Sequence, residues 1–314
     1  MNTHINTLSV VIPVYGSERI IDQLYQELTN VLSEQYSDFE IIFVEDSSPD
    51  NVWNKIVNIS SKDKNVIGIQ LMKNSGQGAA TLCGIKEASG EVIVTMDDDL
   101  QHPPSEIKKL VDYLLSNDSL DVVIGVPKEK RHNFVRRIGS DFINRLNSIF
   151  LNKDKNLRFT GFRAIRRQAA IGLTEISTPY PALGPLIIQV TRRIENTTFN
   201  HQKRVVGRSN YSFSRIIKQT LSNFIGYSML PLRIMAFIGG IGIVTSIILG
   251  AFYLWRYFFV GISIAGWTSL ILVLVSIAGF IFFAFAILGE YILRIMQVTN
   301  SNPQYSVRKK TKFD

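Results

Sequence analysis

The chain has 314 residues, enough for one large domain or for one medium domain with an appendage. Its net charge is +8, and its hydrophobic fraction of 46% lies at the upper edge for a soluble protein. The single cysteine, Cys83, excludes an internal disulfide and favours a reducing compartment. The polar residues 1–7 do not resemble a signal peptide, so the N-terminal part is expected to stay in the cytoplasm.

The first 126 residues alternate between two local patterns. Short runs rich in β-branched residues predict strands at 8–14, 40–44, 66–71, 92–96 and 121–126. Helical patterns between them predict helices near 20–33, 51–60, 77–88 and 105–115. This alternation predicts an α/β fold with a mainly parallel sheet covered on both faces. In such sheets, ligands bind beyond the carboxyl ends of the strands.

Unusual residues collect at four of these strand ends, in 13–18, 45–48, 74–77 and 97–99. The three aspartates Asp97, Asp98 and Asp99 follow the strand at 92–96 directly. A triplet of acids is often a solvated turn or a helix N-terminus, but four such ends together favour a binding site. Close carboxylates repel one another, so a divalent cation is their expected partner.

A metal held by aspartates has hard oxygen ligands, which favours Mg²⁺ or Mn²⁺ over zinc. No Cys/His cluster with zinc spacing is present. Such an ion commonly bridges phosphates, so a nucleotide diphosphate is the expected ligand. The motifs GxxxxGKS and GxGxxG are absent, which argues against a P-loop ATPase and a dinucleotide-dependent dehydrogenase.

Basic segments follow at 128–137 and 199–209, with a helix expected near 136–150. Apolar residues then recur at three- and four-residue spacing through 213–225. This amphipathic helix could pack on the sheet. Because it leads into a strongly apolar region, a position in the bilayer interface is favoured.

Two long uncharged runs, 234–255 and 257–289, predict a transmembrane hairpin with spans at about 234–256 and 267–289. Buried core helices are the alternative, but two adjacent runs with a short link at 260–266 fit a hairpin better. Basic residues on both sides place both termini in the cytoplasm. The positive net charge then indicates binding to anionic lipids and phosphates rather than to nucleic acid. Gly239, Gly240 and Gly242 would permit close helix packing, within the hairpin or in a homo-oligomer.

Four motifs carry a family resemblance: VVIPVYGSE, VEDSS, KNSGQGAA and MDDDLQHPP. They resemble successive motifs of the family 2 glycosyltransferases, inverting enzymes with a nucleotide-sugar-binding GT-A fold. The segments TGFRAIRR, VVGRSNYSF, SMLPLR, LGEYILRI and NPQY extend the resemblance over nearly the whole chain. Together they are similar to the polyprenyl-phosphate glycosyltransferases, which include dolichyl-phosphate mannose synthases and bacterial undecaprenyl-phosphate glucosyltransferases.

The resemblance implies roles for individual residues. The three aspartates Asp97, Asp98 and Asp99 would form the catalytic acidic motif, and Asp97, Asp99 and Gln101 would be metal ligands. The residues implied in nucleotide-sugar binding are Pro13, Tyr15, Glu18, Asp46, Asn74, Gly76 and Gln77. The residues implied in binding the acceptor phosphate are Arg131, Arg136, Ser140, Arg204 and Arg208. Arginine suits this task because its planar group binds phosphate through two bonds.

Two departures from the family pattern matter, and one likeness to another class of synthase is rejected. Thr160-Gly161-Phe162-Arg163 stands where many relatives have Gly-Asp-Phe-Arg, so the aspartate proposed as a base is missing. A phosphate monoester is already a dianionic nucleophile near neutral pH, so a base is not required. The sequence at 44–48 also departs from the usual turn. The segment 189–193 lacks the tryptophan of processive synthases, and two spans make a processive enzyme a poor fit.

These observations predict an enzyme that transfers one sugar, with a UDP-linked donor favoured, to undecaprenyl phosphate for modification of a cell-envelope polysaccharide such as O-antigen. The predicted parts are a cytoplasmic GT-A domain (1–209), an interfacial helix (210–232), the hairpin (233–296) and a basic cytoplasmic tail (297–314), in a bacterial inner membrane. Two alternatives are an acceptor that is a lipid diphosphate saccharide and a non-catalytic scaffold that binds nucleotide sugar. The sequence does not identify the sugar.

Overall fold

The computed structural model describes residues 7–128, 157–178, 181–199, 266–299 and 303–311, together with single helical positions between 235 and 259. These residues belong to two compact units. The first unit comprises residues 1–212 and 301–314, and the second comprises residues 213–300.

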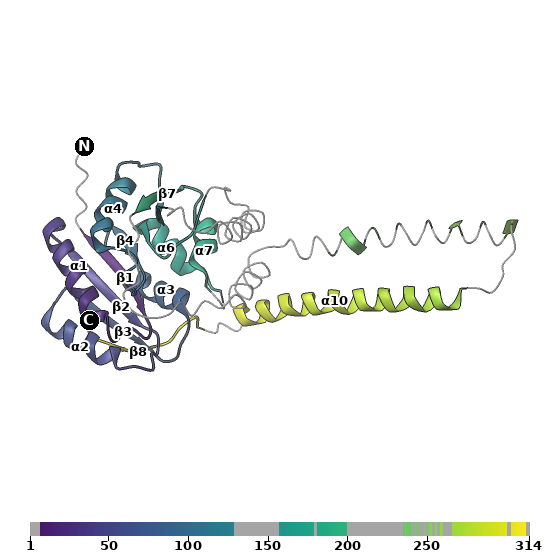
Figure 1. Ribbon diagram of the computed structural model, residues 1–314, viewed down its shortest axis with the longest axis horizontal. Helices are drawn as coiled ribbons and strands as arrows, with labels where there is room; N and C mark the ends of the chain where they lie inside the picture. Colours follow the sequence, from purple (N-terminus) through teal and green to yellow (C-terminus); the bar gives the residue numbers. More distant parts are fainter. Residues whose placement is uncertain are drawn as a thin grey trace. The chain divides into compact units, whose positions relative to one another are not determined.

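The first unit is built on an eight-stranded sheet with the order β7-β5-β6-β4-β1-β2-β3-β8 (Figure 1). Its strands are β1 (Leu8–Val14), β2 (Phe39–Glu45), β3 (Val66–Leu71), β4 (Val92–Thr95), β5 (Val122–Pro127), β6 (Arg163–Arg166), β7 (Ile194–Phe199) and β8 (Val307–Lys310). The four central strands β4, β1, β2 and β3 are parallel. Strand β6 is antiparallel to β4 and β5, while β7 is parallel to β5. The predicted α/β fold with a mainly parallel sheet is confirmed.

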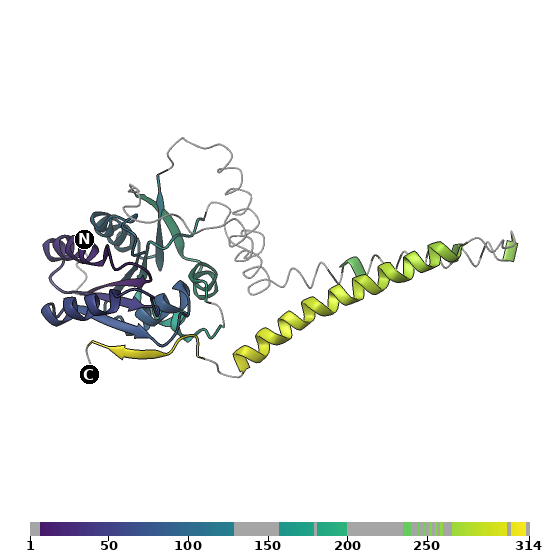
Figure 2. The ribbon, with the colours of Figure 1, turned by 60° about the horizontal axis from the view of Figure 1, so that its bottom comes forward.

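Helices cover both faces of this sheet, as Figures 1 and 2 show. They are α1 (Ile21–Gln35), α2 (Val52–Lys62), α3 (Gln77–Glu87), a short 3₁₀ helix η1 (Pro104–Glu106), α4 (Ile107–Leu115), α6 (Arg167–Glu175) and α7 (Leu183–Val190). On one face, α1, α2 and α4 share a buried core with alternate residues of β1 and β2, because successive strand side chains point to opposite faces. On the other face, α3 lies close to the sheet at Gly84. A Cβ there would clash with Val11 and lie 3.0 Å from Val44.

Strand β8 comes from the predicted basic tail. It pairs antiparallel with β3, so the tail contains part of the sheet (Figures 1 and 2). The amide of Gly68 donates to the Thr311 hydroxyl, and the Thr311 amide donates to the Gly68 carbonyl, both at 2.9 Å. A strand of only four residues with three cations has no strand pattern, which explains why the sequence did not predict it.

The second unit contains α10 (Trp267–Thr299), a helix of 33 residues. The predicted second span, 267–289, lies within it, whereas most of the first span, 234–256, lies outside the described residues. Within the part of the chain that the structure describes, no helix meets the combined length and apolarity needed to cross a membrane. The predicted interfacial helix, 210–232, lies outside the described residues.

Candidate active site

The carboxyl ends of β1 and β4 are tied together by Asp98. Its carboxylate accepts a hydrogen bond from the Tyr15 amide at 3.1 Å and a second, very short one from the Ser17 hydroxyl. Burial raises the pKa of Asp98 to about 6, the two hydrogen bonds oppose this shift, and the charges of Asp97 and Asp99 add to it. Asp98 therefore fixes the loop after β1, which is a different task from that of its two neighbours.

The ends of β2 and β3 are joined in the same way by Asp46. Its two carboxylate oxygens accept hydrogen bonds from the amides of Ser75 and Gly76 at 2.6 and 2.8 Å. Gly76 has a φ of +88°, a backbone conformation that favours glycine. Asp46 is only 3% exposed, so it holds the loop at Ser75 and Gly76 through buried hydrogen bonds. The contact with a nucleotide base that the resemblance implies for Asp46 stays a prediction.

Asp97 and Asp99 lie beside two glutamine amides. The Gln77 side chain donates to Asp97 at 2.5 Å, and the Gln101 side chain donates to Asp99 at 2.5 Å. Leu100, between Asp99 and Gln101, is buried with a φ of +58°. A leucine in this region is strained, and such strain clusters at functional sites. The structure thus places Gln77 against Asp97 and Gln101 against Asp99, while metal binding by Asp97, Asp99 and Gln101 stays a prediction.

His102 packs beneath the loop 97–101 and contacts the backbone of Asp97. Its Nδ1 lies 3.4 Å from the Asp97 amide, in hydrogen-bonding geometry, and 3.9 Å from a carboxylate oxygen of the same residue. The ring stacks on Phe162 at 5.3 Å between centroids and meets the edge of Phe199 at 5.5 Å. With 6% exposure, His102 is a structural residue of the site.

The segment that replaces the family's Gly-Asp-Phe-Arg lies directly against Asp97. A Cβ on Gly161 would lie 2.7 Å from one carboxylate oxygen of Asp97 and closer still to the other. Arg163 comes next on β6. Burial lowers the pKa of Arg163 to about 10, and the charge of Asp97 opposes this shift, so the guanidinium is charged at neutral pH. Its Nε is buried without a hydrogen-bond partner among the described residues.

The other predicted nucleotide-binding residues lie in the same loops. Pro13 is buried in β1 opposite Val44, and Tyr15 is 52% exposed. Glu18 accepts the amide of Asn51 at 3.2 Å, which ties it to the start of α2. Asn74 and Gln77 are exposed. The predicted acceptor-phosphate residues Arg131, Arg136, Ser140, Arg204 and Arg208 all lie outside the described residues.

A divalent cation fits the chemistry of the acidic pair. Asp97 and Asp99 are half-buried and supply hard oxygen ligands. The amide of Gln101 presents an oxygen to the same place when it is rotated by half a turn, because its nitrogen and oxygen are nearly equivalent in shape. Among the described side chains, no group of three or more His, Cys, Asp or Glu residues is arranged to hold a metal.

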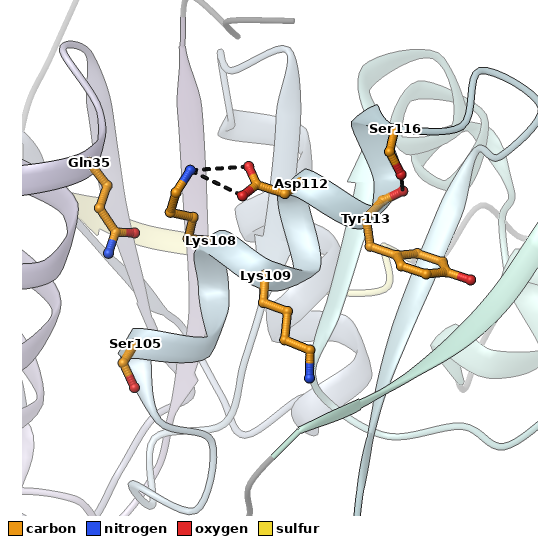
Figure 3. A pocket seen from close by; sticks show the side chains of 7 residues that line it. All are labelled: Gln35, Ser105, Lys108, Lys109, Asp112, Tyr113 and Ser116. Carbon is orange, nitrogen blue, oxygen red and sulfur yellow. Dashed lines mark hydrogen bonds and ion pairs between the residues drawn. The ribbon is translucent and has the colours of Figure 1, made fainter. Parts of the chain in front are cut away.

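A hollow of about 540 Å³ lies elsewhere on the first unit, along α4 (Figure 3). Gln35, Ser105 and residues of α4 line it, and none of them is a predicted site residue. Its cations are paired, since Lys108 lies 3.0 Å from Asp112 and Lys109 lies 3.7 Å from Glu106. These pairs leave little reason to expect an anionic ligand there.

Replacing Glu45 by glutamine is expected to stabilise the fold at neutral pH. Glu45 is 1% exposed, its Oε2 has no hydrogen-bond partner, and burial raises its pKa. When folding raises the pKa of a carboxyl group, the folded protein loses stability as the pH rises from the group's unfolded pKa to its folded pKa. Glu45→Gln should therefore gain about 1 kcal/mol at pH 8. The gain should shrink towards the acid range, where the unfolded chain also holds the proton.

Urea unfolding of both proteins between pH 4 and pH 8 measures this difference. Glu40→Gln is the control, because Glu40 accepts hydrogen bonds from the hydroxyls of Ser9 and Ser89, at 2.6 and 2.9 Å. A stability difference for Glu45→Gln that does not vary with pH would show that folding does not shift the pKa of Glu45.

Sequence reasoning missed three features of this site. The distinct role of Asp98 had no sequence signal, because it depends on hydrogen bonds from Tyr15 and Ser17, which lie more than 80 positions earlier. The packing of Gly161 against Asp97 had no signal, because it joins segments far apart in the chain. The third feature is the close approach of Gly78 to the Pro181 carbonyl, where a Cβ would clash. It places the start of the segment 181–190 at the loop of Gly76 and Gln77.

Comparison with known proteins gives a consistent result. The profile of the family described as "Glycosyl transferase family 2" matches residues 9–173. An undecaprenyl-phosphate 4-deoxy-4-formamido-L-arabinose transferase of Proteus mirabilis is 31% identical, over 97% of this chain and 94% of the relative. Its counterpart from Pectobacterium carotovorum is 32% identical over the same shares.

Solved structures of more distant proteins share the fold. Glucosyl-3-phosphoglycerate synthase of Mycobacterium tuberculosis, in complex with Mn²⁺, UDP-glucose and phosphoglyceric acid, is similar with a TM-score of 0.51 and 18% identity. The similarity covers 70% of this chain and 79% of that one. Mannosyl-3-phosphoglycerate synthase of Rubrobacter xylanophilus gives a TM-score of 0.51 at 12% identity, over 68% and 70% of the two chains.

Proposed function

Because this chain belongs to glycosyl transferase family 2, we propose that it transfers one sugar from a nucleotide diphosphate sugar to undecaprenyl phosphate. The main support is its similarity, over 97% of its length, to relatives named as undecaprenyl-phosphate sugar transferases. The lipid-linked sugar would then supply the modification of a cell-envelope polysaccharide.

In the proposed reaction, an oxygen of the acceptor phosphate attacks the anomeric carbon while the bond from this carbon to the diphosphate breaks. The nucleoside diphosphate leaves, and the configuration inverts. The acceptor is already a dianion near neutral pH, so no side chain need remove a proton. This agrees with Gly161, which has no acidic group at the position of the family's aspartate. The protein's task is then to position two anions and to stabilise the leaving diphosphate.

The site residues divide this task. Asp97 and Asp99, with Gln101, would hold a divalent cation, Mg²⁺ or Mn²⁺, and its charge would neutralise the departing diphosphate when bound. Arg163 adds a buried positive charge beside Asp97. Asp98 and Asp46 keep the loops after β1 and β3 in place. The segment that begins at Pro181 approaches α3 at Gly78, and it would help to distinguish one donor from another.

A membrane location remains part of the proposal. The uncharged runs at 234–255 and 257–289 support an anchor with both termini in the cytoplasm of a bacterium. Basic residues at 128–137 and 199–209 would hold the lipid phosphate while its polyprenyl tail stays in the bilayer.

A donor screen tests the proposed function. Purified protein is incubated with undecaprenyl phosphate, Mg²⁺ or Mn²⁺, and one of several donors: UDP-4-deoxy-4-formamido-L-arabinose, UDP-glucose, UDP-galactose, UDP-N-acetylglucosamine or GDP-mannose. Mass spectrometry should detect one lipid-phosphate sugar, and EDTA should abolish it. Product with a lipid diphosphate saccharide alone would overturn the acceptor assignment. Absence of product with every donor and acceptor, despite nucleotide-sugar binding, would favour a scaffold.

A further inference from the structure

Strand β8 reaches the loop that carries the predicted nucleotide-binding residues Asn74, Gly76 and Gln77. The contact is made at Met72, the first residue after β3. Its amide donates to the Ser306 carbonyl at 2.8 Å, and its carbonyl accepts a hydrogen bond from the Arg308 guanidinium at 3.2 Å. Both hydrogen-bonding groups of this backbone position are thus satisfied by the tail.

The same tail also holds α3, the helix at the other end of the loop. The hydroxyl of Tyr305 and the thiol of Cys83 are close enough for each to shift the pKa of the other. Burial raises the pKa of Cys83 to about 12, so the thiol stays protonated. One helical turn after Cys83, Glu87 of α3 forms an ion pair with Lys310 of β8 at 2.6 Å. Since α3 begins with Gln77, which donates to Asp97, the tail is one helix away from the acidic pair.

The loop of residues 72–76 is therefore held at three places: at Met72 by the tail, at Ser75 and Gly76 by Asp46, and at its far end by α3. We propose that the segment 303–311 is a positioning element of the donor site, with Arg308 as the side chain that fixes the loop. This inference rests on the proposed function, because it assigns the loop to binding of the donor nucleotide.

The physical reason is preorganisation. Without β8, β3 would be the edge of the sheet, and its exposed amides and the following loop would open more easily. A loop that is already ordered loses less entropy when it binds a ligand, so the ligand binds more tightly. The effect should concern the donor, whose predicted contacts lie in this loop, and not the lipid acceptor.

The test compares Arg308→Ala with Lys309→Ala in the full-length protein. Both variants remove one positive charge from neighbouring positions of β8, and both side chains are exposed. Arg308 contacts the Met72 carbonyl, whereas Lys309 is paired with Gln70 through the strand register. Arg308→Ala should raise the KM for the nucleotide sugar and the Kd for the nucleoside diphosphate about fivefold. Lys309→Ala should leave both constants unchanged, and neither variant should alter the KM for undecaprenyl phosphate.

Hydrogen exchange supplies a readout that does not depend on activity. In Arg308→Ala, the amides of residues 72–77 should exchange faster while those of β1 and β4 keep their protection. Equal behaviour of the two variants, or faster exchange throughout the sheet, would overturn the inference. If the unaltered protein transfers no sugar, the proposed function fails, but nucleotide affinity and exchange still decide whether the tail orders the loop.

Discussion

Replacing Asp99 by asparagine should reduce sugar transfer by about a thousandfold or more and leave the fold intact. Asp99 is half-buried at the carboxyl end of β4, next to the amide of Gln101. Asparagine keeps the shape but removes the negative charge that a divalent cation requires. The measurement is the initial rate with the donor identified by the screen, at saturating Mn²⁺, together with the urea midpoint.

Asp98→Asn is the matched control, because it makes the same chemical change one residue away. The Asp98 carboxylate accepts hydrogen bonds from the Tyr15 amide and the Ser17 hydroxyl. Its replacement should lower stability by about 1–2 kcal/mol, whereas Asp99→Asn should not. If Asp99→Asn retained a tenth of the activity or more, the assignment of Asp99 as a metal ligand would be wrong.

Introducing an aspartate at Gly161 should abolish transfer and not restore a base. Many relatives have an aspartate at this position, so the substitution would be expected to restore the missing acidic group. In this chain, however, even a Cβ at Gly161 would lie 2.8 Å from the carboxylate carbon of Asp97. The added group must displace Asp97, and its charge would repel the same carboxylate. A loss of at least about a hundredfold in kcat is expected, since small shifts of a catalytic group have effects of this size.

Gly161→Ala separates the two causes, because it adds the Cβ without the charge. It should lower kcat less than Gly161→Asp does, and it should weaken the apparent affinity for Mn²⁺ in the same direction. The pH profile of kcat provides a further check. An active Gly161→Asp variant whose kcat–pH profile gains a new acidic limb would contradict this prediction. It would show that a base can act here and that Asp97 can move to make room for it.

The sequence was sufficient for the central sheet of this protein and for the loops that gather at its edge. Continuous apolar strands and the βαβ alternation predicted the central strands with boundaries within about two residues, because local patterning decides both. It also predicted that the loops after β1, β2, β3 and β4 meet. What it could not supply depends on contacts between distant segments. Strand β6 shows this, since it pairs with β4 about 70 positions earlier in the chain. The packing of Gly161 on Asp97 follows from that pairing.

The roles of the individual aspartates also depend on contacts between distant segments. The resemblance assigned the metal to Asp97 and Asp99, and it placed Asp98 with them in the catalytic motif without a role of its own. The structure separates Asp98, which accepts hydrogen bonds from the loop after β1, from the other two. A motif specifies which residues are present, whereas burial and hydrogen-bond partners specify what each of them does.

The origin of β8 also has a consequence for how the protein is made. Residues 307–310 leave the ribosome after the whole of the second unit, residues 213–300. Until then, β3 is an open edge with unpaired backbone groups, the kind of edge that invites aggregation. The sheet is therefore completed last, by contacts of long sequence separation that form slowly. During synthesis, a chaperone that binds extended strands would find its substrate at β3.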